Sequence, residues 1–237
     1  TSAWLKWKAT ACSGVVRSKT HRAVLRILPL PGSKFYADVW RDERDYPPKK
    51  MEREELYPMK DRKKLEALFH KNGYTDFKWV EPGEVVVSQW VRTKCMFGCG
   101  NYGHNATCPP NVPSVAEVRQ LFAEYRAVVI FHFAHTVDKP EDRHAWTRGV
   151  NQELLKLERA LFLAGHYKAF LLCCDSCYLC TDCSGTRGTC KNPRSARPSP
   201  ESMAIDVFAT VRKVGFPIEV LTEYSQAMNR YAFLLIE

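Results

Sequence analysis

The chain has 237 residues, a formal net charge of +9 and 45% apolar residues, which is enough for one large folded domain with a buried core. It contains no unbroken apolar run of about 18 residues, so we expect no membrane-spanning helix, and its first residues lack the order typical of a signal peptide. A cytoplasmic location is the resulting expectation, and in a reducing compartment the ten cysteines favour metal binding over a disulfide framework.

Residues 1–55 are predicted to form a basic, poorly patterned extension. The first fifty residues carry eleven Lys and Arg against four Asp and Glu, whereas fifteen basic and fourteen acidic residues follow from Cys95 onward. The apolar segment 24–28 fits neither the helical nor the strand period well, 46–50 resembles a linker, and Cys12 stands alone as an expected free thiol. No nucleic-acid motif accompanies the positive charge, so we favour a loosely ordered extension over a basic arm and do not expect nucleic acid as a partner.

The remaining residues, 56–237, are predicted to form one cysteine-rich metal-binding domain. Helices are expected at 60–72, from Ser114 with Glu117 at the capping-box position, at 146–164 and at 200–214. Strands are expected at 77–80, 85–91, 127–134, 168–174, 217–221 and 230–236. This alternation predicts an α/β fold, with a mixed sheet, flanking helices and two cysteine-rich loops at strand ends. We expect these two loops to form one shared metal-binding edge.

The most informative stretch runs from Cys177 to Cys190, where four cysteines lie within fourteen residues. Cys177, Cys180 and Cys183 follow C-x2-C-x2-C spacing. The residues between them are mostly polar or glycine, so this loop needs a metal or disulfides to become ordered. Compact groups of this kind bind iron–sulfur clusters, usually through four thiolates, and Cys190 is the candidate fourth ligand. Zinc is the alternative, but structural zinc sites more often use two C-x2-C pairs separated by a longer span.

A second group comprises Cys95, Cys99 and Cys108, in a stretch rich in glycine and proline. Three thiolates suggest a second cluster whose fourth ligand comes from elsewhere, or an iron left open for a substrate or partner. The candidates for that fourth ligand are Cys173, Cys174 and His104. Arg197, which follows the longer cysteine loop, is expected to orient an anion at the cofactor site.

Several motifs resemble those of a family known only as predicted metal-binding proteins, which carries a domain-of-unknown-function label. The first is K-C-x2-G-C-x2-Y-G-x4-C-P-P, from Lys94 to Pro110. The others are C-x-L-C-x2-C from Cys177, C-x2-P from Cys190, A-R-P-S from Ala196, the stretch 203–207 and G-F-P from Gly215. The resemblance covers about residues 60–237 and includes the seven cysteines of the two groups. It implies a cysteine-rich metalloprotein of anaerobic metabolism, with iron–sulfur as the expected chemistry.

The sequence therefore predicts a metal-binding protein with one 4Fe–4S cluster, or two, that acts in electron transfer with a redox partner protein. One alternative is a cluster-dependent enzyme that uses an open iron site on a small molecule. The other is a zinc-stabilised binding module whose basic arm engages nucleic acid.

Overall fold

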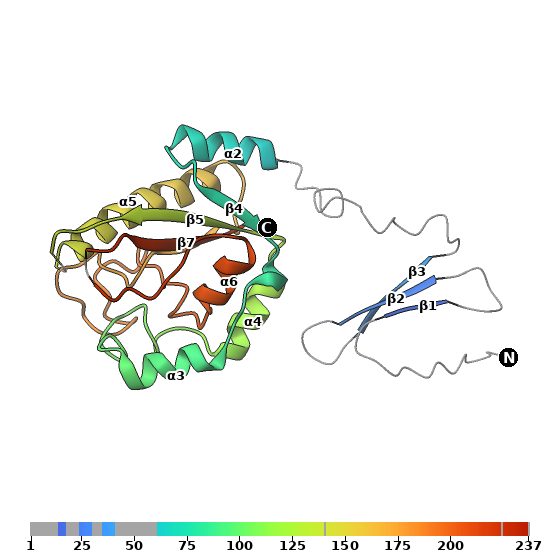
Figure 1. Ribbon diagram of the computed structural model, residues 1–237, viewed down its shortest axis with the longest axis horizontal. Coiled ribbons are helices and arrows are strands. Elements are labelled where there is room, and N and C mark those ends of the chain that lie inside the picture. The colour runs from blue at the N-terminus through green and yellow to red at the C-terminus, as the bar shows by residue number, and fades with distance from the viewer. Residues whose placement is uncertain are drawn as a thin grey trace. The chain divides into compact units, whose positions relative to one another are not determined.

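The computed structural model describes residues 61–139, 141–223 and 225–236, together with the backbone of three strands nearer the N-terminus (Figure 1). The chain divides into two compact units, Thr1–Met59 and Lys60–Glu237. This division lies close to the predicted boundary after residue 55.

The first unit contains a three-stranded antiparallel sheet in the order β1-β2-β3. Its strands are β1 (Gly14–Arg17), β2 (Val24–Pro29) and β3 (Phe35–Trp40). The segment 24–28, whose pattern fitted neither period, lies within strand β2. Cys12 and the expected linker at 46–50 lie outside the described residues.

The second unit is built on a four-stranded sheet in the order β4-β5-β7-β6. Its strands are β4 (Phe77–Val80), β5 (Ala127–His135), β6 (Phe170–Leu172) and β7 (Met228–Ile236). Every neighbouring pair runs antiparallel, with Leu234 of β7 opposite both Val129 and Leu171. The prediction of a mixed sheet is therefore wrong, although the α/β class with flanking helices is correct.

Helices cover both faces of this sheet (Figure 1). They are α2 (Arg62–Lys71), α3 (Gln89–Gly98), α4 (Val115–Ala123), α5 (Asp142–Leu163) and α6 (Val207–Lys213). Side chains of β5 alternate between the faces, so Ile130 joins Phe122 of α4 and Val211 of α6 in one core cluster. On the other face Phe131 packs edge-on against Phe69 of α2, with ring centroids 5.2 Å apart. No helix within the described ranges is long and apolar enough to cross a membrane.

Two predicted strands do not form in the described part of the chain, and the helix predicted at 200–214 is present only from Val207 to Lys213. The valine-rich segment at 85–91 forms only a bridge between Val87 and Ile205 before α3 begins at Gln89. The stretch from 200 to 204 is a series of turns, with Ala204 at φ 60°, and α6 starts only after its N-cap Asp206. The stretch at 217–221 pairs with no strand of the described chain.

Candidate metal centre and adjoining cavity

The first cysteine group begins on a helix rather than in a loop. Cys95 lies in the last turn of α3, and Cys99 is the C-cap residue. The expectation that this group follows a strand is therefore wrong. The spacing of four residues along the helix brings Cys95 and Cys99 to the same side of α3.

Tight turns after α3 lead the chain back to Cys108. Gly103 donates its N–H to the carbonyl of Pro109 at 2.8 Å and has a φ of 74°, a left-handed conformation that favours glycine. The Asn105 side chain accepts from the N–H of Thr107 at 2.9 Å. Cys108 is buried, and burial raises the pKa of its thiol.

The second cysteine group follows β6, as predicted. Hydrogen bonds with a residue of α5 fix the backbone at the point where this loop begins. The Asn151 side chain donates to the carbonyl of Cys174 at 2.9 Å and accepts from the Cys174 N–H at 3.0 Å. Cys173 and Cys174 are both buried at this anchor, whereas His104 is exposed in the turn before Cys108. A role for any of these three as a fourth ligand stays a prediction.

The two cysteine loops contact each other, as expected of a shared edge. The Asn111 side chain donates to the carbonyl of Gly185 at 3.0 Å, and that of Asn105 donates to the carbonyl of Cys177 at 3.4 Å. These bonds join segments more than seventy residues apart. One region of the molecule therefore carries both cysteine groups.

Four cysteines of the second loop surround one small cavity. Cys177, Cys180, Cys183 and Cys190 line it, and residues 105–107 of the first loop close it. Its volume of about 10 Å³ is room for about one water molecule. All nine cysteines of the described ranges are free thiols. The residues that the sequence singled out as one ligand set are thus gathered around one space.

Several N–H groups point at the sulfur atoms of this set. The backbone N–H of Ala106 donates to Cys183 Sγ at 3.4 Å, and the Asn192 side chain donates to Cys180 Sγ at 3.0 Å. Burial raises the pKa of the Cys177 thiol, and backbone hydrogen bonds from Leu179 and Arg197 act in the opposite direction. Donors directed at sulfur favour its thiolate form, which is the form that binds metals.

This donor set fits a thiolate-bound metal centre. It offers four cysteines on a surface loop and hydrogen bonds to their sulfur atoms, which suits either an iron–sulfur cluster or zinc. Within the described ranges, no group of three or more Cys, His, Asp or Glu side chains is already arranged to hold a metal ion. The four thiols would therefore have to move to coordinate one.

Arg197 takes part in a structural network beside this loop. Its guanidinium pairs with the carboxylate of Glu158, with Nε–Oε1 at 2.9 Å and Nη2–Oε2 at 2.7 Å. Its Nη1 donates to the carbonyls of Arg194 and Ala196. Glu158 also accepts from the N–H of Leu171 at 2.8 Å, which links α5, β6 and the end of the loop. A role for Arg197 in orienting an anion stays a prediction that these contacts do not favour.

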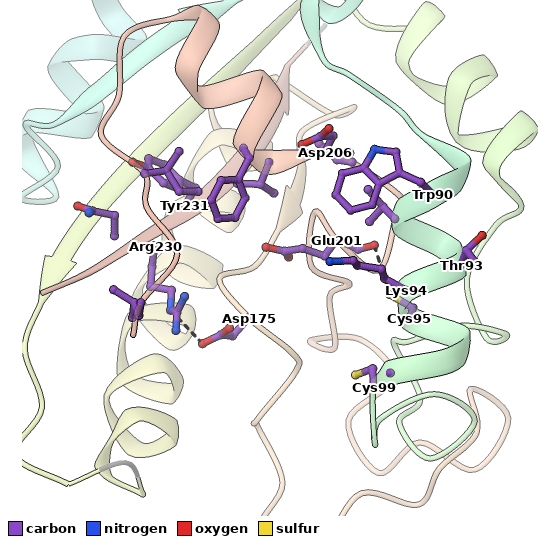
Figure 2. A pocket seen from close by; sticks show the side chains of 18 of the residues that line it. Trp90, Thr93, Lys94, Cys95, Cys99, Asp175, Glu201, Asp206, Arg230 and Tyr231 are labelled. Carbon is purple, nitrogen blue, oxygen red and sulfur yellow. Dashed lines mark hydrogen bonds and ion pairs between the residues drawn. The ribbon is translucent and has the colours of Figure 1, made fainter. Parts of the chain in front are cut away.

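A much larger cavity, of about 730 Å³, borders Cys95 and Cys99 (Figure 2). Its walls come from α3, β7, the turns before α6 and the segment that includes Ile218 and Leu221. Figure 2 shows Glu201 reaching between α3 and the ion pair of Asp175 with Arg230, whose Oδ2 and Nε lie 3.4 Å apart.

No pattern in the sequence predicted this cavity. Its charged residues are scattered along the sequence from Lys94 to Arg230 without motif spacing, and folding alone brings them together. The left-handed conformation of Asp175, at φ 54°, is equally invisible in the sequence. Burial raises the pKa of the Glu201 carboxyl, although the side chain remains open to the cavity.

Comparison with known proteins agrees with the cysteine pattern. No curated protein and no solved structure matches the chain. One family model, described as "Predicted metal-binding protein (DUF2284)", matches residues 78–236. The matched range includes both cysteine groups and all four strands of the second sheet, apart from Phe77 at the start of β4. The match extends over more than half of the chain, and the protein therefore belongs to the DUF2284 family of predicted metal-binding proteins.

Proposed function

We propose that this metal-binding protein carries a 4Fe–4S cluster on Cys177, Cys180, Cys183 and Cys190 and acts in electron transfer in anaerobic redox metabolism. The observation that carries the proposal is the gathering of these four cysteines around one cavity. Their compact C-x2-C-x2-C spacing is less typical of structural zinc. A bound cluster would supply one-electron redox chemistry.

The surroundings of the four cysteines suit electron exchange with a partner protein. Cys183 is exposed, and Cys180 and Cys190 are half-buried, so the site lies close to the protein surface. The donors of Ala106 and Asn192 would stabilise negative charge on sulfur, which is one way a protein sets a reduction potential.

A second candidate function is favoured by the large cavity. Cys95, Cys99 and Cys108 would hold a further metal centre with three protein ligands, and the first two of them border that cavity. A small molecule in the cavity would then lie beside the centre. This is the arrangement that a cluster-dependent enzyme with an open iron site requires.

The proposal is tested on the full chain purified without oxygen. We expect a broad absorbance near about 400 nm that bleaches on reduction, which is the behaviour of a thiolate-bound cluster. Cys180→Ser should lose most of this absorbance, whereas Cys12→Ser, outside both cysteine groups, should keep it. A colourless protein, or equal spectra for the two variants, would refute the assignment.

A further inference from the structure

The cavity beside α3 has the size of a small-molecule site. Its volume of about 730 Å³ falls within the range of about 300–1,000 Å³ found for ligand pockets. Phe97 stands 82% exposed on α3 and also lines the cavity. A cavity this large is not needed to hold a metal centre on the neighbouring cysteines.

One part of the cavity wall is apolar. Trp90 of α3 and Phe208 of α6 contribute aromatic rings, and Ile218 and Leu221 contribute aliphatic side chains. Trp90 is half exposed even though its ring is one of the largest in the second unit. Apolar surface that remains open in a concave site favours a ligand with an apolar body.

Among the carboxylates of the wall, Glu201 forms no direct ion pair with a described residue, although the charge of Arg230 acts on it from farther away. Asp206 is engaged as the N-cap of α6, since it accepts from the N–H of Ala209 at 2.9 Å. Asp175 pairs with Arg230. Glu201 has no cation within ion-pair distance among the residues that the structure describes. Its side chain extends into the space between α3 and the Asp175–Arg230 pair (Figure 2).

The other charged residues of the wall do not neutralise the negative charge of Glu201. Lys94 stands over the ring of Trp90, with Nζ 5.7 Å from the ring centroid, and Glu219 adds another exposed carboxylate to the wall. Four carboxylates therefore face two cations in the cavity, one of which already has its partner. An anionic ligand would meet this excess of negative charge, whereas a cation would relieve it.

We propose that the cavity binds a small organic amine, with its ammonium group at Glu201 and its apolar body between Trp90 and Leu221. An aromatic wall beside a carboxylate is a favourable environment for an organic cation. The proposal does not depend on which metal the cysteines bind.

The test measures binding of three probes of the same shape to the full chain, purified without oxygen, by calorimetry at neutral pH. Phenethylamine should bind at least about tenfold more tightly than phenethyl alcohol, because a charged hydrogen bond is stronger than a neutral one. Phenylacetate should bind more weakly than the amine. Tighter binding of phenylacetate, or no binding of any probe, would overturn the proposal.

Two variants locate the binding. Glu201→Gln should lower the affinity for phenethylamine about tenfold, to the level of the alcohol, whereas Glu153→Gln on the exposed side of α5 should leave it unchanged. Leu221→Trp fills the cavity while leaving Glu201 in place and should weaken binding of all three probes. An amine preference that survives in Glu201→Gln, or amine binding unaffected by Leu221→Trp, would refute the site. Metal content is measured on the same samples, so this outcome is distinct from a failure of the cluster assignment.

Discussion

The ion pair of Glu158 with Arg197 gives the sharpest prediction about what holds the longer cysteine loop in place. Glu158 is 6% exposed, and its carboxylate accepts bonds from Arg197 Nε at 2.9 Å and from the Leu171 N–H at 2.8 Å. Its second oxygen lies 2.7 Å from Arg197 Nη2. Glu158→Gln keeps the shape of the side chain, but its amide N–H₂ group faces the guanidinium donors in place of an oxygen.

The expected loss of stability follows from the buried charge of Arg197 that Glu158→Gln leaves without a carboxylate. The Arg197 side chain is only 19% exposed, so its charge would remain largely buried without its carboxylate. Breaking a buried pair by removing one partner typically costs about 3–5 kcal/mol. At about 2–4 °C per kcal/mol for a protein of this size, the melting temperature should fall by roughly 6–20 °C.

The same helix supplies a matched control. Glu153 pairs with Lys156 at 2.6 Å, but their side chains are 62% and 70% exposed, so Glu153→Gln should change the free energy of unfolding by less than about 1 kcal/mol. Urea unfolding followed by circular dichroism compares the two variants, and metal content is checked in both. Equal stabilities for Glu158→Gln and Glu153→Gln would show that the buried pair does not support the fold.

Three further predictions concern the core, a helix cap and the sulfur environment. Phe69→Ala should lower the free energy of unfolding by about 3–5 kcal/mol, because the fully buried ring packs against Phe77 and Phe131. A loss below about 1 kcal/mol, measured by urea unfolding, would contradict this packing. Ser114→Ala removes the hydroxyl that accepts from the N–H of Glu117, so stability should fall by about 0.5–2 kcal/mol, and unchanged urea unfolding would argue against the cap. Asn192→Ala removes the N–H group that donates to Cys180 Sγ. Because the reduced metal centre carries more negative charge, and this donor stabilises that charge, its loss should make the reduction potential more negative by on the order of tens of millivolts. Redox titration measures this shift, and a positive shift would refute the role of that bond.

Elements with strong local signals could be predicted from the sequence. The capping box of Ser114 and Glu117 marks the start of α4, and its two reciprocal hydrogen bonds are present. Residues 128–131 of β5 and 231–236 of β7 are buried on both faces, and their nearly continuous apolar runs predicted these strands. Local chemistry was sufficient in these cases.

Elements decided by distant contacts could not be predicted. The direction of β7 relative to β5 depends on how the chain returns to the sheet, which no local pattern records. The valines at 85–87 favour a strand, yet the segment makes only one bridge because its neighbour is a turn. Contact with that turn, rather than β-propensity, decides the conformation.

In the candidate site, too, features that depend on local sequence could be predicted, and features that depend on distant contacts could not. Closely spaced thiols can be recognised in the sequence as candidate metal ligands, and the four cysteines of the second group do line one cavity. The ligand role of all seven cysteines stays a prediction. The placement of Cys95 on a helix, the engagement of Arg197 and the charged cavity around Glu201 depend on tertiary packing. These features required the structure.

The central proposal is tested most directly by measuring iron, acid-labile sulfide and zinc in the full chain purified without oxygen. A 4Fe–4S cluster on the Cys177–Cys190 loop predicts about four iron and about four sulfide per chain, and about twice these values if the Cys95 group also holds a cluster. Stoichiometric zinc without sulfide would contradict the iron–sulfur assignment.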